Sequence, residues 1–251
     1  MDSEGVRSRI EAGRRFLRAE WELFEGIATD QSRGVAVPDQ QKPLPEGARV
    51  VELPDPGSIS LGSTPLLQAF RGRRSRRKFG PGPLGLDELA FLLWATQGME
   101  KLTPSHRLRT VPSAGARHSL ETYLYLARVT GVEPGLWRYQ PIEHAIVLLQ
   151  EDRDLAARMD EALFQQYWKA AAVFVWTTVP YRTEWRYSVV SHKVIALDAG
   201  HVCQNLYLAC EAIGCGTCAL GAYDQEKLDG LLGVDGHDEF AIYAAPVGRK
   251  P

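Results

Sequence analysis

The chain has 251 residues, of which 45% are hydrophobic and 24% charged, a composition typical of soluble globular proteins. Its 29 basic and 31 acidic side chains give a net charge of −2, which excludes a wholly basic nucleic-acid-binding chain. No apolar run approaches the roughly 18 residues of a membrane span, and the N-terminus lacks the apolar core of a signal peptide. We therefore expect a cytoplasmic protein with reduced thiols and no membrane partner.

The first 64 residues predict a helix and a proline-rich arm ahead of a domain at 65–251. Five apolar residues recur at helical spacing before Gly26, namely Val6, Ile10, Leu17, Trp21 and Phe24. Residues 37–57 carry five prolines, which exclude a helix and favour an extended arm. Because the arm is long for a connection within one domain, we expect it to cover a surface, such as that of a partner subunit.

From residue 65 the chain alternates between helical and strand patterns. The predicted helices are 65–70, 86–97, 154–168, 193–213 and 225–232. The predicted strands are 122–129, 136–139, 145–149, 171–179 and 240–247. The run 171–179 is almost wholly apolar, which is typical of a central strand covered on both faces. Together these elements predict an α+β sandwich rather than a strict βαβ repeat.

A basic run at residues 71–78 holds six arginines and lysines in eight positions. Arg73 and Arg77 are four residues apart and would share a helical face, with the hydroxyl of Ser75 between them. Two guanidiniums and a hydroxyl suit a phosphate dianion, because arginine offers paired donors in a fixed geometry. The alternatives are a solvated charged face or a localisation-type tract.

The same run carries a family resemblance. Arg73-Arg74-Ser75-x-Arg77-x-Phe79 matches the R-R-S-x-R-x-F opening of the nitroreductase-like flavoproteins. Further matching phrases follow in order at 91–98, 112–126, 135–139, 197–214 and 216–224. The ordered set, with DQSRG at 30–34, resembles the SagB-type dehydrogenase branch. That branch includes FMN-dependent oxidases that convert thiazolines and oxazolines in modified peptides into thiazoles and oxazoles.

The resemblance implies a nitroreductase-like FMN-binding sandwich, with a central mixed sheet flanked by helices and FMN at a homodimer interface. It implies that the phosphate and ribityl chain are held by Arg73, Ser75 and Arg77, with Arg74 near the flavin ring and Arg249 against the phosphate. It places two further segments beside the flavin, at Ser113, Ala114 and Gly115 and at Gly216, Ala219, Leu220 and Gly221. Small residues in both segments permit a close backbone approach to a flat ring, and Ser113 could donate a hydrogen bond to it.

Arg186 and Tyr187 are the candidate catalytic residues. Azoline oxidases of the branch resemble this segment but carry Lys-Tyr. Arginine stays protonated, so Arg186 cannot replace the lysine as a base, although it could orient an anionic substrate. We therefore expect weak or absent azoline oxidation, with Tyr187 as the better candidate for handling a proton. The alternative is that both residues only pack at the start of the following helix.

Two further groups of polar and thiol residues allow more than one interpretation. Asp198, His201 and Asn205 share one stripe of the long predicted helix, which favours a buried polar seam over a catalytic triad. Cys215 and Cys218 form a C-x-x-C, but no second close pair accompanies it, so we expect packing cysteines and no metal.

These features predict an FMN-dependent oxidoreductase that transfers hydride through flavin N5, with azoline rings in a modified peptide as one substrate class. The first alternative is an NAD(P)H-dependent reductase of nitro compounds or quinones, and the second is a non-catalytic scaffold subunit of a biosynthetic complex. The expected partners are a second copy of the chain, a small-molecule or peptide substrate, and NAD(P)H or O2. A nucleic-acid binder is disfavoured, because no aromatic residues interleave the basic run.

Overall fold

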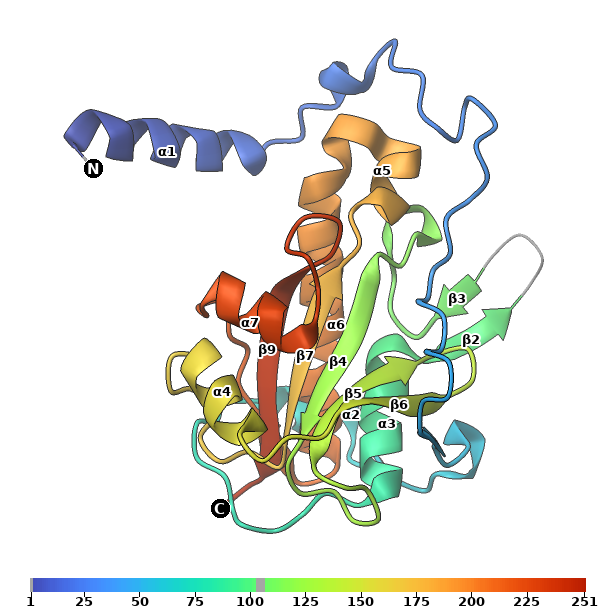
Figure 1. Ribbon diagram of the computed structural model, residues 1–251, viewed down its shortest axis with the longest axis vertical. Helices are drawn as coiled ribbons and strands as arrows, with labels where there is room; N and C mark the ends of the chain where they lie inside the picture. Colours follow the sequence, from blue (N-terminus) through green and yellow to red (C-terminus); the bar gives the residue numbers. More distant parts are fainter. Residues whose placement is uncertain (1, 103–106) are drawn as a thin grey trace.

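The structure, a computed structural model, describes residues 2–102 and 107–251 (Figure 1). Its centre is a seven-stranded sheet of order β1-β6-β5-β4-β7-β9-β8. The strands are β1 (Val50–Glu52), β4 (Leu120–Leu126), β5 (Gly135–Gln140), β6 (Ala145–Gln150), β7 (Ala172–Thr178), β8 (Cys215–Thr217) and β9 (Phe240–Arg249). A separate hairpin joins β2 (Met99–Leu102) and β3 (Arg107–Arg109).

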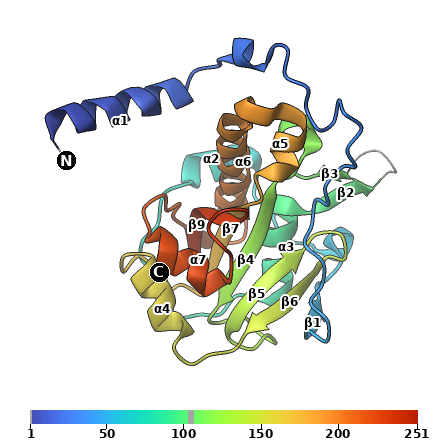
Figure 2. The same ribbon diagram turned by 45° about the horizontal axis from the view of Figure 1, so that its top comes forward.

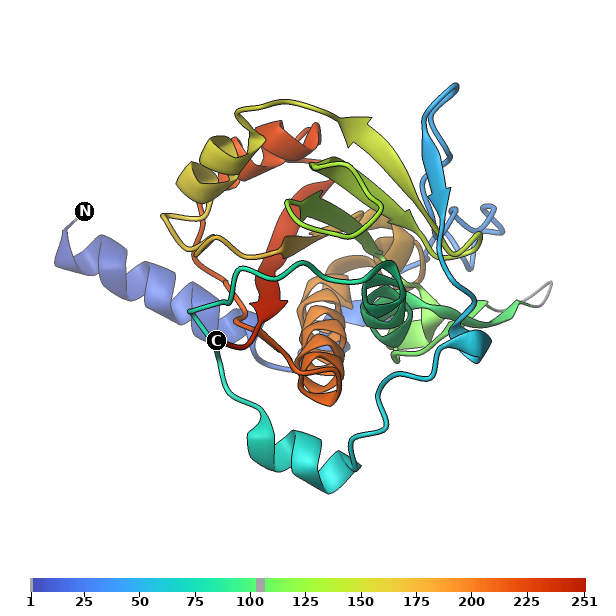
Figure 3. The ribbon, with the colours of Figure 1, turned by 90° about the horizontal axis from the view of Figure 1, so that it is seen from below.

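Helices cover both faces of the sheet. The α-helices are α1 (Ser3–Phe16), α2 (Leu66–Gly72), α3 (Leu86–Gln97), α4 (Leu155–Ala162), α5 (Tyr181–Tyr187), α6 (Ser191–Ala212) and α7 (Gln225–Leu232). Figure 3 shows α3 and α6 on one face, α4 and α7 on the other, and α2 lying outside α6. Figure 2 shows α1 projecting away from the body, and none of its residues is buried.

Two apolar cores lie on the two faces of the sheet. In β7, Phe174 and Trp176 face the core beneath α3 and α6, while Val173 and Val175 face the core beneath α4 and α7. All four side chains are fully buried, because successive side chains of a strand point to opposite faces and both faces are covered. The predicted central strand is therefore confirmed.

The predicted α+β class is confirmed, but the strand directions differ from the expected mixed sheet. All six pairings between neighbouring strands of the sheet are antiparallel. Among the described residues, the parallel component consists of isolated bridges, one from Ser75 to Thr217 at the β8 edge and one from Leu84 to Val129. Most strands are therefore joined by hairpins or long returns rather than by right-handed crossovers.

Two predicted helices end earlier than their apolar spacing indicated. α1 ends at Phe16, and Trp21–Phe24 forms a separate 3-10 turn, η1. None of the residues of α1 is buried, so packing against the described part of the chain does not extend the helix beyond its own propensity. α4 ends at Ala162 because Phe164 and Gln165 adopt left-handed backbone conformations, with φ of 53° and 59°, which a right-handed helix cannot include.

The N-terminal arm lies along the body of its own chain rather than standing free. β1 pairs with β6 and forms one edge of the sheet. In Figure 1 the preceding stretch runs down the side of the molecule from the level of α5 to this edge. At β1, the arm therefore covers a surface of its own protomer.

No helix in the described part of the chain is both long and apolar enough to cross a bilayer.

Candidate functional site

The basic run becomes extended where α2 ends. Residues 73–77 run alongside β8, and Ser75 forms a bridge with Thr217. The helical face expected for Arg73 and Arg77 is therefore wrong. In an extended chain every second side chain points to the same side, so Arg73, Ser75 and Arg77 still share one side of the segment.

Tyr207 of α6 connects the basic segment to the loop after β8. Its hydroxyl lies 2.9 Å from Ser75 Oγ and accepts the Ala219 N–H at 2.8 Å, and the Arg73 guanidinium stacks on its ring at 5.3 Å. Tyr207 is 9% exposed. Tyr207 was not predicted from the sequence, although a tyrosine on the buried stripe of a helix has a hydroxyl that needs a partner.

The arginines of the run differ in what they bind. Arg74 donates to two nearby backbone carbonyls at 2.8 and 2.9 Å, and Arg76 pairs with Glu211 at 3.4 Å. Within residues 2–102 and 107–251, no carboxylate lies within ion-pair distance of Arg73 or Arg77. Two guanidiniums beside the Ser75 hydroxyl are therefore available to an anion.

The segment from Gly216 to Gly221 lies directly beside the basic run. An added Cβ at Gly216 would lie 2.6 Å from Cδ of Arg76, so the Arg76 side chain can pack against this residue because it is glycine. Beyond it, Ala219 donates to Tyr207, buried Leu220 exchanges backbone hydrogen bonds with β9, and Gly221 has open space around it.

The loop at residues 112–116 is fixed by a buried carboxylate. Asp198 of α6 is 6% exposed and accepts the Ala114 N–H at 3.1 Å and a hydrogen bond from the Ser113 hydroxyl. Ser113 Oγ in turn accepts the His118 N–H at 2.9 Å. The Ser113 hydroxyl is thus engaged within the loop, and its expected donation to a flavin stays a prediction.

Asp198→Asn is expected to make the protein more stable at pH 7. Burial raises the pKa of Asp198, so the folded state disfavours the charged form more than the unfolded state does. The resulting loss of stability begins as the pH rises through the unfolded pKa of about 3.9 and is complete above the folded pKa. Asparagine keeps an oxygen for the Ala114 N–H and removes the charge.

Urea unfolding at pH 4 and pH 7 measures this effect. The gain in the asparagine variant should be larger at pH 7 than at pH 4. Asp198→Ala serves as the control, since it leaves the Ala114 N–H without a partner and should cost about 1–3 kcal/mol. An asparagine variant whose deficit grows with pH would show instead that the charge stabilises the fold.

Arg186 and Tyr187 meet this loop at Gly115, whose φ is 57°. An added Cβ at Gly115 would lie 2.7 Å from the Tyr187 hydroxyl and 3.0 Å from Nε of Arg186. The ring of Trp21, from η1, contacts that of Tyr187 edge-on at 6.0 Å. The structure therefore brings together the candidate catalytic pair and the candidate flavin loop, which are far apart in the sequence.

Helix α6 sets the spacing between the two halves of the candidate site. The loop at 112–116 is bound at Asp198 and the basic segment at Tyr207, nine positions further along α6. At about 1.5 Å of rise per residue this is about 13.5 Å along the axis.

Arg249 is engaged elsewhere in the protomer. Its guanidinium binds Glu88 of α3 through two bonds of 2.5 and 2.6 Å and donates to the Pro83 carbonyl at 3.1 Å. An incoming phosphate would compete with this carboxylate. The placement of Arg249 against a phosphate stays a prediction.

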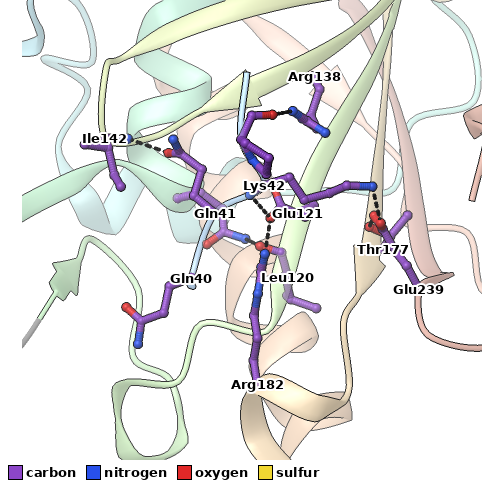
Figure 4. A network of polar contacts seen from close by, with 12 residues as sticks. Gln40, Gln41, Lys42, Leu120, Glu121, Arg138, Ile142, Thr177, Arg182 and Glu239 are labelled. Carbon is purple, nitrogen blue, oxygen red and sulfur yellow. Dashed lines mark hydrogen bonds and ion pairs between the residues drawn. The ribbon is translucent and has the colours of Figure 1, made fainter. Parts of the chain in front are cut away.

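The N-terminal arm holds both α5 and the loop in place (Figure 4). The Lys42 N–H and Arg182 of α5 both donate to Oε1 of Glu121, at 2.8 and 2.5 Å. Glu121 is 2% and Arg182 4% exposed. Two residues earlier, Gln40 donates to the Ala116 carbonyl at 2.6 Å. The arm therefore belongs to the framework that positions the candidate catalytic residues.

The remaining polar and thiol residues behave as packing groups. Asn205 donates to the Ala95 carbonyl at 2.8 Å, while His201 is exposed. The four cysteines are free and buried. Burial raises the pKa of Cys203 to about 12 and that of Cys215 to about 11, which keeps these thiols protonated and unreactive at neutral pH.

The residues of the basic segment fit a phosphate-bearing flavin. The fit rests on the two guanidiniums without a carboxylate partner and on the hydroxyl between them, a donor set that suits a phosphate dianion. Gly221 has open space where a side chain would begin, whereas Tyr187 and Arg186 fill that position at Gly115 and Arg76 fills it at Gly216.

Comparisons with known proteins agree on both the fold and the family of this chain. Residues 70–249 match the model of the nitroreductase family. The chain is 33% identical over 201 residues to the Methanocaldococcus jannaschii protein MJ1384, which bears a nitroreductase name, covering 80% of this chain and 96% of that protein. It is 26% identical over 186 residues to the trifolitoxin-processing protein TfxB of Rhizobium leguminosarum, covering 67% of this chain and 48% of TfxB.

Three solved structures share the fold. A nitroreductase-type protein of Ralstonia eutropha superposes with a TM-score of 0.66 at 26% identity, covering 84% of this chain and 94% of that one. A chain of the Escherichia coli microcin synthetase McbBCD complex, with truncated pro-MccB17 bound, gives 0.62 at 15% identity, with 100% and 95% covered. An FMN complex from Desulfovibrio desulfuricans gives 0.50 at 17%, with 74% and 87% covered.

The family model covers more than two thirds of the chain, and the relative from M. jannaschii is aligned over nearly its whole length. The resemblance expected from the R-R-S-x-R-x-F segment and the phrases that follow it is confirmed. The chain belongs to the nitroreductase family.

Proposed function

We propose that the protein is an FMN-dependent oxidoreductase that works as a homodimer. The observation that carries the proposal is the extended segment in which Arg73 and Ser75 both contact Tyr207, while neither Arg73 nor Arg77 has a carboxylate partner among the described residues. Membership of the nitroreductase family and the FMN complex of a protein with the same fold support it.

The residues near Tyr207 and those near Asp198 of α6 would have different roles. Arg73, Ser75 and Arg77 would hold the phosphate, and the segments at 113–115 and 216–221 would lie against the ring. When bound, the flavin supplies the hydride-accepting centre. Tyr187, beside Gly115, is the residue placed to take or give a proton, and Arg186 supplies a fixed positive charge next to it.

We propose further that the protein belongs to the SagB-type branch and acts on a peptide or a peptide-derived ring. The likeness to TfxB and the fold shared with the McbBCD complex support this placement. Arg186 stands where azoline oxidases of the branch carry lysine. Since arginine cannot act as the base for ring oxidation, reduction of a nitro or quinone acceptor by NAD(P)H is the second candidate.

The testing experiment is a titration of the purified protein with FMN, riboflavin and FAD, followed by absorbance and flavin fluorescence. FMN should bind at about one per subunit and more tightly than the other two. Equal affinity for riboflavin would overturn the phosphate assignment, and failure to bind FMN would overturn the proposal. Anaerobic addition of NADH or NADPH to the loaded protein then shows whether either bleaches the flavin.

Tyr187→Phe is expected to lower turnover while leaving the flavin spectrum unchanged, because only the hydroxyl beside Gly115 is lost. Arg186→Lys is the companion variant. A lysine there can be desolvated into a base, so this change should create or raise thiazoline oxidation. Native thiazoline oxidation at a rate that neither change alters would contradict these roles.

The homodimer should be visible by light scattering of the FMN-loaded protein. α2 exposes three large apolar side chains, Leu66, Leu67 and Phe70, on the outside of α6. Burying them against a second copy removes apolar surface from water. A monomer with full flavin occupancy would contradict this expectation.

A further inference from the structure

Arg117 is a buried cation without an anionic partner. It is 8% exposed, its Nε donates to the Gly115 carbonyl at 3.1 Å, and its guanidinium stacks on the Trp185 ring at 5.1 Å. Its Nη1 is buried and has no hydrogen-bond acceptor, and no ion pair to it exists in the described part of the chain. Burying an arginine in this way is unfavourable unless something else compensates its charge.

A second cation lies beside it. Arg186 lies at the same glycine, with its Nε 3.0 Å from the position that a Cβ on Gly115 would take. Burial and the like charge of the neighbouring Arg186 both lower the pKa of Arg117. Arg182, by contrast, is equally buried but is paired with Glu121 at 2.5 Å. An incoming anion would relieve the repulsion at Gly115.

The groups around the two arginines indicate which anion fits. The Tyr187 hydroxyl lies at the same glycine, and the edge of Trp21 lies against the Tyr187 ring. Gly115, Arg186 and Tyr187 are half-buried, so this side of the cluster is open to solvent. Planar guanidiniums with a neutral hydroxyl and aromatic walls suit a carboxylate on a flat or apolar group.

We propose that Arg117 and Arg186 form a binding site for a carboxylate carried by the substrate. The proposal rests on the proposed function, since it places the substrate at the loop that would lie beside the flavin. The FMN phosphate is assigned to a different place, because its segment contacts α6 at Tyr207, about 13.5 Å along the helix from Asp198. The substrate class is therefore acidic.

The test uses benzoate as the probe and benzamide as its uncharged counterpart. Both are titrated into the FMN-loaded protein, and tryptophan fluorescence reports binding because Trp185 and Trp21 lie at the site. Arg117→Leu and Arg186→Leu should each weaken benzoate by about tenfold or more, the effect of losing a hydrogen bond to a charged group. Neither change should alter the weaker affinity for benzamide.

Arg49→Leu is the matched control. Arg49 also stacks on a tryptophan, Trp137 at 6.0 Å, but it has a carboxylate partner in Glu151 at 3.4 Å. Its loss should leave benzoate binding unchanged. Should Arg117→Leu fold poorly, Arg117→Lys keeps the charge without the planar pair of donors and should weaken benzoate to an intermediate extent.

Two results would overturn the inference. One is native protein that binds benzoate no more tightly than benzamide. The other is loss of benzoate binding when FMN is loaded, together with a lower flavin potential in Arg117→Leu, which would assign the charge to the flavin instead. Failure of FMN to bind at all is a separate outcome, since it contradicts the proposed function while benzoate binding to the flavin-free protein still tests this site.

Discussion

Replacing Arg182 by methionine is expected to lower the free energy of unfolding by about 3–5 kcal/mol, because it leaves a buried carboxylate without its cation. Glu121 is 2% exposed, and its remaining donor is the Lys42 N–H at 2.8 Å. Urea or guanidinium unfolding followed by fluorescence measures the change. The effect should extend to the site, because Arg182 anchors the helix that carries Arg186 and Tyr187.

Two further variants show whether the charge or the packing is responsible. Replacing both partners, as Glu121→Leu with Arg182→Met, should recover much of the loss, since an apolar pair can replace a buried ion pair. Arg158→Met breaks an exposed pair with Asp152, whose side chains are 43% and 36% exposed, and should cost less than about 1 kcal/mol. Equal losses at Arg182 and Arg158 would contradict the argument.

Arg73→Ala and Arg77→Ala are each expected to weaken FMN binding by about 1.5–3 kcal/mol, the range for hydrogen bonds to charged groups. This corresponds to roughly 10- to 150-fold in the dissociation constant. Riboflavin lacks the phosphate, so its affinity should change little in either variant. Both arginines lack carboxylate partners in the described residues, so their removal leaves no anion unpaired within the chain.

Arg74→Ala is the control within the same run. Its guanidinium already binds two backbone carbonyls, so it should affect FMN less than either neighbour does. If Arg74→Ala weakened FMN binding as much as Arg73→Ala and Arg77→Ala, the run would act through its overall charge. The alternating direction of side chains along the extended segment would then not matter.

Regular elements were predictable where local signals agree. The ranges of α3 and α7 match the expected 86–97 and 225–232 to the residue, since apolar periodicity and glycines just beyond the helices act together. The end of α4 was not predictable, because Phe164 and Gln165 are ordinary helix residues that adopt left-handed conformations here. Their backbone is set by the surrounding packing and not by their own preferences.

The candidate site was predictable in part. Family phrases pointed to the segments that the structure brings onto α6, and Arg73 and Ser75 do share one side, although through an extended chain rather than a helix. Tyr207 and Arg117 were missed because their significance lies in partners distant in sequence. A tyrosine or arginine in an apolar stretch does not reveal whether its polar atoms find acceptors.

Asp198 and Tyr207 are nine positions apart on α6, so the helix fixes the distance between the loop and the basic segment. Adding or removing one residue there would shift one anchor by about 1.5 Å and turn it by about 100°, so the loop and the basic segment would face different directions. The exposed side chains between the two anchors can change, but the number of residues cannot, and the buried ones such as Val202 and Leu206 also hold the core. Divergence in substrate must therefore come from replacements such as Arg186, or from the loops, and insertions should be confined to the chain outside this stretch.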